Sequence, residues 1–190
     1  MILGITGTIG AGKSTVCKIL SKKNIPIVSA DDIGHKILQK EEVKEILLKT
    51  FGNIFNENGQ VDRKLLADIA FGSKENLEKL NSITHPLIRE EIKKQATELE
   101  KTYPIVACEI PLLFESGWTD LCDKILTVYL SKEETVNRLI IRGMTEDDAL
   151  RRYEIQMSPE EKIRKSHFSV CNDGNFEKLA FKVAQVLDKC

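Results

Sequence analysis

The sequence predicts an α/β fold in three layers, in which helices cover both faces of a parallel sheet of five strands. Five short apolar runs predict the strands: residues 2–6, 25–29, 103–108, 124–130 and 167–170. Segments with helical periodicity separate these runs, and strands that alternate with helices are typical of a parallel sheet. The third run is nearly all apolar, as is expected of a strand that is covered on both faces.

The composition is that of a globular protein of one domain. The chain has 190 residues, which is enough to bury a substantial core. Its 28 basic and 29 acidic residues give a net charge of -1, so no bulk field attracts nucleic acid or an anionic membrane. No apolar run approaches the roughly 20 residues of a membrane span, and the N-terminus lacks a signal-peptide pattern. We therefore expect a cytoplasmic protein without nucleic-acid or membrane partners.

The cysteines indicate a reducing environment. Their number is odd and they form no C-x-x-C pair: Cys17, Cys108, Cys122, Cys171 and Cys190. This spacing favours reduced core or surface thiols over a disulfide framework or a zinc site.

A phosphate-binding loop follows the first strand. The fixed positions of the motif G-x-x-x-x-G-K-[ST] hold Gly7, Gly12, Lys13 and Ser14. Glycines allow the backbone N–H groups to converge on an anion, and the helix that follows adds its positive end. Such turns also occur without a ligand, but the flanking strand and helix favour a triphosphate site in a fold of the P-loop NTP hydrolase type.

The motif predicts roles for single residues of the loop. Its ATP-binding residues are Gly10, Ala11, Gly12, Lys13, Ser14 and Thr15. We expect Lys13 to reach the β- and γ-phosphates, and the Ser14 hydroxyl to ligate the Mg²⁺ that bridges them.

Acidic residues follow the second and third strands. Asp31, in Ala30-Asp31-Asp32, could accept the proton of an attacking hydroxyl, because ligands of open α/β sheets lie beyond the carboxyl ends of the strands. Either aspartate could instead be the N-cap of the next helix. Glu109 ends the third strand, where other phosphate-loop proteins place an acid near Mg²⁺.

Residues 41–101 predict a helical insertion between the second and third strands. Asp62 and Ser73 are candidate N-caps, and Thr84–Leu87 predicts the start of a long helix with Pro86 in its first turn. His85, beside this start, is either a local hydrogen-bonding residue or a ligand of the substrate.

Residues 132–166 predict a helical lid. Helices are expected from Ser131 to about Arg142, from Thr145 and from Ser158. Arg138 and Arg142 are four residues apart and share a face, which suits either charge stabilisation over a triphosphate or a solvated salt-bridged pair. Beyond the fifth strand, Asn172 could hydrogen-bond an adenine edge or form an Asx-turn.

These stretches together resemble the dephospho-coenzyme A kinase family, and the resemblance runs from Ile2 to about Gly174. The motifs that carry it are Thr6–Thr15, Val28–Asp31, Phe51-Gly52, Gly59, Asp62-Arg63, His85-Pro86, Pro111–Glu115, Arg138, Arg152 with Gln156, and Asn172. The resemblance implies ATP-dependent phosphorylation of the 3′-hydroxyl of dephospho-coenzyme A, with Mg²⁺. It also implies a nucleotide-binding core of residues 1–40, 102–131 and 167–190.

The resemblance assigns further roles. It implies that Asp31 is the catalytic base, with Lys13 and Arg138 on the transferred phosphoryl group and Arg142 and Asn172 on ATP. Asp31, His85 and Glu115 are the implied substrate contacts, and the chain would be a monomer or a weak homo-oligomer. Ser29 stands where the family has the first aspartate of Asp-Ala-Asp, so it cannot act as a carboxylate.

Two other functions stay open from the residues. The first is another small-metabolite or nucleoside-monophosphate kinase on the same scaffold. The second is a nucleotide-dependent switch, against which the absence of a guanine-reading Asn-Lys-x-Asp run counts.

Overall fold

The computed structural model describes residues 1–190, except for the side chain of Phe71. Its five-stranded sheet has the order β2-β3-β1-β4-β5, and every strand pair is parallel. The strands are β1 (Ile2–Gly7), β2 (Ile27–Ser29), β3 (Val106–Glu109), β4 (Lys124–Tyr129) and β5 (Phe168–Cys171). The predicted parallel α/β fold is confirmed.

The register brings three strand ends to one edge of the sheet. In the centre, β1 pairs Ile5 with Glu109 of β3 and Gly7 with Val128 of β4. Ser29 of β2 also pairs with Glu109. The first turn after β1 therefore begins at the same edge as the ends of β2 and β3, which is where parallel sheets bind ligands.

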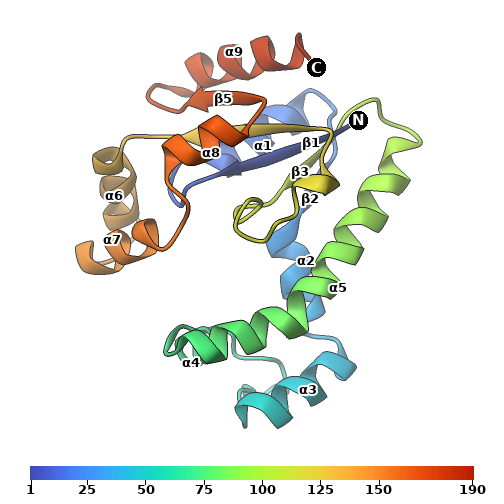
Figure 1. The fold of residues 1–190 in the computed structure, drawn as a ribbon, viewed down its shortest axis with the longest axis vertical. Coiled ribbons are helices and arrows are strands. Elements are labelled where there is room, and N and C mark those ends of the chain that lie inside the picture. The colour runs from blue at the N-terminus through green and yellow to red at the C-terminus, as the bar shows by residue number, and fades with distance from the viewer. The chain divides into compact units, whose positions relative to one another are not determined.

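Nine helices longer than one turn are present in the described residues: α1 (Lys13–Lys22), α2 (Ala30–Ile37), α3 (Glu41–Phe51), α4 (Arg63–Phe71), α5 (Lys74–Glu100), α6 (Lys132–Ile141), α7 (Glu146–Glu154), α8 (Pro159–Lys165) and α9 (Phe176–Leu187). A 3₁₀ turn, η1, covers Thr119–Leu121. Helices α1 and α9 pack against each other, and α9 lies along β5 (Figure 1).

The main core joins the sheet to α1 and α9. It includes Leu3 and Ile5 of β1, Leu20 of α1, Leu126 of β4 and Val183 of α9. All five are buried, and burial of side chains of this size supplies about 1.5–3 kcal/mol each. The phosphate loop therefore joins two elements of this core, β1 and α1.

The chain forms two compact units. The first unit contains residues 1–29 and 95–190, and the second contains residues 30–94. In the second unit, Ile33 and Ile37 of α2 and Val43 and Leu47 of α3 are buried.

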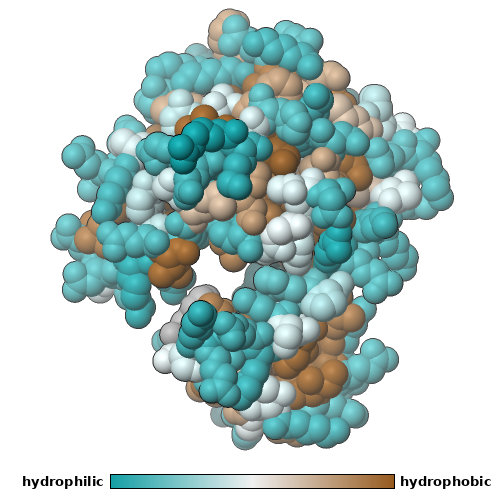
Figure 2. All heavy atoms as spheres, viewed as in Figure 1, coloured by the Kyte–Doolittle hydropathy of each residue, from teal (hydrophilic) through white to brown (hydrophobic). Residues whose placement is uncertain are grey.

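On the face drawn in Figure 2, hydrophilic side chains cover most of the surface. Across the described residues, no helix is both long and apolar enough to cross a membrane.

The predicted helix start at Thr84–Leu87 is wrong, because α5 runs without a break from Lys74 to Glu100 with Pro86 inside it. Pro86 has no N–H, so one carbonyl of the preceding turn loses its helical partner. The hydroxyl of Thr84, in the same turn, donates to the carbonyl of Leu80 at 2.9 Å. The helix begins instead at the predicted cap Ser73, whose Oγ accepts from the Asn76 N–H at 3.1 Å.

Candidate functional site

The phosphate loop has a backbone that only glycine can adopt at its key positions. Gly7, Gly10 and Gly12 have φ angles of 145°, 76° and 95°, which L side chains rarely occupy. A Cβ on Gly7 would collide with the carbonyl of Val128, and one on Gly12 would collide with the side-chain amide of Asn172. Val128 of β4 and Asn172, just beyond the end of β5, therefore leave no room for a side chain at these two positions of the loop.

Lys13 folds back onto the loop. Its side chain is buried, and Nζ donates to the carbonyl of Gly7 at 2.9 Å and to that of Thr8 at 3.0 Å. Ser14 is exposed in the first turn of α1, and Thr15 is half-buried beside it. The positive end of α1 and the Lys13 ammonium thus meet at one place, an arrangement that binds anions.

Asn172 braces the loop from the end of β5. Its side-chain Nδ2 donates to the backbone carbonyl of Ala11 at 2.8 Å. The backbone carbonyl of Asn172 accepts from Nη2 of Arg138 at 2.8 Å. The side chain is buried. The side-chain amide nitrogen of Asn172 therefore bonds the phosphate loop, a contact that neither of its predicted roles, an adenine contact or an Asx-turn, included. Arg142, one turn beyond Arg138, is exposed at the end of α6.

Glu115 lies in a cluster that sequence reasoning missed. Its Oε1 accepts from the Met157 N–H at 3.0 Å, and both carboxylate oxygens lie within 3.1 Å of Nζ of Lys162. Nζ also donates to the carbonyl of Pro111 at 3.0 Å. Lys162 is completely buried, and burial lowers its pKa while the bonded Glu115 carboxylate acts in the opposite direction. No local signal marks this lysine, since lysines on short helices are normally exposed.

Glu109 has a thiol neighbour on α1. The Cys17 thiol donates a hydrogen bond to the Glu109 carboxylate, and Cys17 is buried. Burial above all, and then the Glu109 charge, raises the pKa of this thiol to about 12. The thiol therefore stays protonated and serves as a hydrogen-bond donor. All five cysteines are free thiols, as predicted.

The predicted substrate residues Asp31 and His85 belong to the second unit, whereas Lys13, Ser14, Arg138 and Asn172 belong to the first. Helix α2 begins at Ala30, so Asp31 and the next residue lie within its first turn and neither is its N-cap. Both carboxylates are exposed. His85 is half-buried in α5, and burial lowers its pKa, which favours the neutral imidazole.

The donor groups at the loop fit Mg²⁺ bound together with phosphates. Within the described part of the chain, no group of three or more His, Cys, Asp or Glu side chains could hold a metal ion by itself. Mg²⁺ does not need such a group, because it usually takes one or two protein oxygens, substrate phosphates and water. The exposed hydroxyl of Ser14 is one such oxygen, at the first turn of α1.

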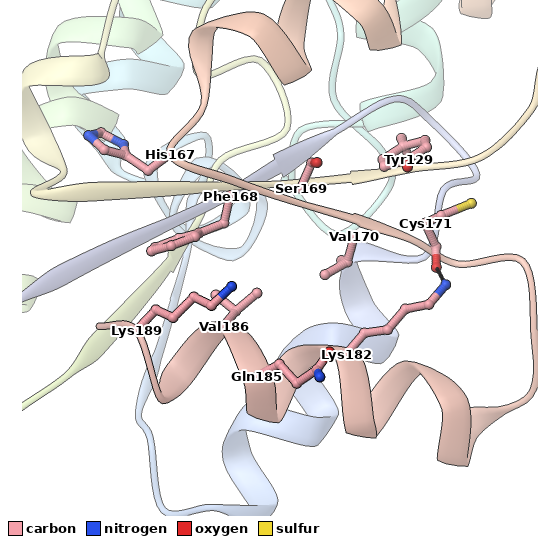
Figure 3. Close-up of a pocket in the computed structure, with 10 residues that line it drawn as sticks. All are labelled: Tyr129, His167, Phe168, Ser169, Val170, Cys171, Lys182, Gln185, Val186 and Lys189. Atoms are coloured by element: carbon pink, nitrogen blue, oxygen red, sulfur yellow. Dashed lines mark hydrogen bonds between the residues drawn. The ribbon is translucent and has the colours of Figure 1, made fainter.

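A hollow lies between β5 and α9, and no residue of the phosphate loop lines it (Figure 3). It measures about 410 Å³ and is lined by Tyr129, His167, Phe168, Ser169, Val170, Cys171, Lys182, Gln185, Val186 and Lys189. Nζ of Lys182 donates to the carbonyl of Cys171 at 2.7 Å, as the dashed line in Figure 3 shows. Lys182 of α9 thus bonds a carbonyl at the end of β5, an edge strand of the sheet.

Comparisons with known proteins point to one family. Residues 1–178 match the protein-family model described as dephospho-CoA kinase. A dephospho-CoA kinase of Fusobacterium nucleatum subsp. nucleatum is 42% identical over 185 residues, which are 96% of this chain and 95% of that protein. Among solved structures, TT1252 from Thermus thermophilus has a TM-score of 0.86 at 34% identity and covers 100% of this chain and 97% of its own. The dephospho-CoA kinase from Campylobacter jejuni has a TM-score of 0.75 at 31% identity, covering 99% and 96%.

Proposed function

Because the chain belongs to the dephospho-CoA kinase family, we propose that it phosphorylates the 3′-hydroxyl of dephospho-coenzyme A with ATP, giving coenzyme A and ADP. This reaction is the last step of coenzyme A synthesis. The family itself is the one predicted from the motifs, and that prediction is confirmed.

The observation that carries the donor half of the proposal is the preformed phosphate loop. Lys13 donates to two carbonyls of the loop, and an incoming triphosphate offers it stronger, charged acceptors. Other backbone N–H groups of the loop and the N-terminus of α1 supply further donors. ATP binding thus replaces internal contacts with charge-assisted ones at little cost in backbone reorganisation.

The transferred phosphoryl group needs charge stabilisation. When Mg²⁺ is bound, it neutralises the charge that develops on the phosphate oxygens, and the Ser14 hydroxyl is the protein group that would hold it. Lys13 and Arg138 add positive charge, and Arg138 is already fixed near Gly12 by its bond to the Asn172 carbonyl. Arg142, exposed and one turn further, is proposed to contact ATP from solvent.

Asp31 is proposed as the base for the 3′-hydroxyl. It follows the end of β2 by two residues, and ligands of parallel sheets bind beyond the carboxyl ends of the strands, which supports this role. An exposed carboxylate is available to an entering hydroxyl. His85 and Glu115 complete the proposed substrate contacts. The Glu115 carboxylate is paired with Lys162 and accepts from the Met157 N–H.

The proposal extends to the state of the protein in the cell. We propose a cytoplasmic monomer or weak homo-oligomer. The free thiols support a reducing compartment, since cytosolic proteins keep cysteines reduced.

A coupled assay of ADP release tests the reaction. We expect turnover with dephospho-coenzyme A as acceptor, and only background rates with nucleoside monophosphates or with water. Efficient turnover with a monophosphate, and none with dephospho-coenzyme A, would favour another small-metabolite kinase. Slow ADP release that no acceptor accelerates would favour a nucleotide-dependent switch.

A further inference from the structure

Ile9 of the phosphate loop contacts residues 132–166. Its side chain packs against a small apolar cluster of Val136, Leu139 and Ala149. Its backbone N–H donates to Oε1 of Gln156 at 2.9 Å, across 147 residues of sequence. The same loop residue is therefore held by its side chain and by its backbone.

Gln156 is held in turn by its neighbours. The next N–H, that of Met157, donates to the Glu115 carboxylate, which is paired with the buried Lys162. Lys162 donates to the Pro111 carbonyl, and that carbonyl also accepts from the Thr6 hydroxyl of β1 at 3.0 Å. A continuous chain of bonds thus fixes Gln156 to the strand that leads into the phosphate loop.

We propose that Gln156 is a positioning residue for ATP, which acts by holding the Ile9 N–H and thereby fixing the first half of the phosphate loop before nucleotide arrives. The inference depends on the proposed function only for the binding of ATP. An N–H that donates to Gln156 is directed away from a phosphate, so the anion is gripped by the amides that follow.

The chemistry of the bond sets the size of the effect. A neutral hydrogen bond in a folded protein contributes about 0.5–1.5 kcal/mol net, which corresponds to roughly two- to tenfold in a binding constant. Without the acceptor, the Ile9 N–H is unsatisfied or the loop relaxes, and ATP must then reorder it. We expect the loss to appear in ATP affinity, because the ATP-bound loop has the same shape with and without the Gln156 acceptor.

The matched variants are Gln156→Leu and Gln39→Leu. Leucine is similar in size to glutamine but has no acceptor. Oε1 of Gln39 accepts from the Val61 N–H at 3.3 Å, so its replacement removes a bond of the same kind in the second unit, outside the phosphate loop. ATP affinity is measured by calorimetry without any acceptor substrate, and exchange of the Ile9 amide is followed by NMR.

We expect Gln156→Leu to weaken ATP binding about three- to tenfold, to accelerate exchange of the Ile9 amide, and to leave kcat at saturating ATP within about twofold. Gln39→Leu should bind ATP like the unmodified protein. Unchanged affinity and exchange in Gln156→Leu would overturn the inference, as would equal weakening in both variants or a loss confined to kcat. If Gln156→Leu does not fold, Gln156→Asn, whose shorter side chain stays polar, is measured against the same expectations. Failure of dephospho-coenzyme A as acceptor would reject the proposed function and leave this test intact.

Discussion

The phosphate loop and the first turn of α2 both follow strands of the same sheet, but their polar side chains differ in exposure to solvent. Lys13 of the loop is 8% exposed, and Asn172, which braces the loop from the end of β5, is 6% exposed; both donate to loop carbonyls. In α2, Asp31 and Asp32 are exposed to solvent. The phosphate loop, the proposed ATP site, is thus formed before ATP binds, from backbone and buried side chains. The first turn of α2 presents carboxylates to water.

The difference follows from the chemistry that each region is proposed to perform. A loop that binds a triphosphate through its amides must hold those amides in place, because each misplaced donor loses a charge-assisted bond. A base needs access to a hydroxyl and an orientation that the bound substrate completes. Substitutions in the two regions should therefore separate binding from turnover.

Lys13→Ala should have the largest effect. It removes a charge from the phosphates and two bonds from the loop, so we expect turnover to fall about 10³-fold or more and ATP affinity to fall with it. Steady-state kinetics and calorimetry with ATP measure both quantities. Normal ATP affinity in this variant would contradict the role of the loop as the triphosphate site.

Asp31→Asn should reduce turnover by about 10²-fold or more and leave ATP affinity within a few-fold of the original. The amide keeps the size of the side chain but cannot accept the proton of the hydroxyl. Asp32→Asn is the matched control, since it removes an exposed carboxylate from the same helical turn. Equal losses of turnover in both variants, or a larger loss in Asp32→Asn, would contradict the assignment of Asp31 as the base.

The two regions also differ in how far the sequence predicts them. The phosphate loop is marked by glycines within a few residues, and the caps at Asp62 and Ser131 are marked in the same local way, so these were predicted correctly. The partners of the loop were not predicted, because Asn172 contacts Ala11 across 161 residues and Gln156 contacts Ile9 across 147. Such pairings depend on how the strands are ordered in space, which no local pattern contains.

Pro86 gives the opposite lesson. A proline usually indicates the first turn of a helix, and the prediction followed that rule. In α5 the rule fails, and the helix continues through Pro86. Thr84, two residues before it, is largely buried by packing, and its hydroxyl donates to the Leu80 carbonyl within the helix. Packing can outweigh the roughly 3 kcal/mol that proline costs in the interior of a helix. The sequence alone does not show that packing.

The Glu115–Lys162 pair provides a test of stability within the first unit. Glu115→Ala leaves the Lys162 ammonium buried without its carboxylate, and we expect a loss of about 2 kcal/mol in the free energy of unfolding. Lys162→Met removes the buried charge and keeps the apolar stem, so it should cost about 1 kcal/mol or less. Urea denaturation measures both. A larger loss in Lys162→Met would show that the charge itself stabilises the fold.

The buried thiols should produce the smallest effect, in alkaline solution. Burial, with the Glu100 charge second, raises the pKa of Cys108 from 9.0 to about 12. The folded chain therefore keeps a proton that the unfolded chain loses above about pH 9, so stability is complete below that pH and falls as the pH rises toward 12. Between pH 8 and pH 9.5 we expect Cys108→Ala to lose about 2 °C less in Tm than the unmodified protein. Cys190→Ser, at an exposed position, should change this slope less. Equal slopes in all three proteins would show that Cys108 ionises alike in the folded and unfolded states, against the shift that its burial implies.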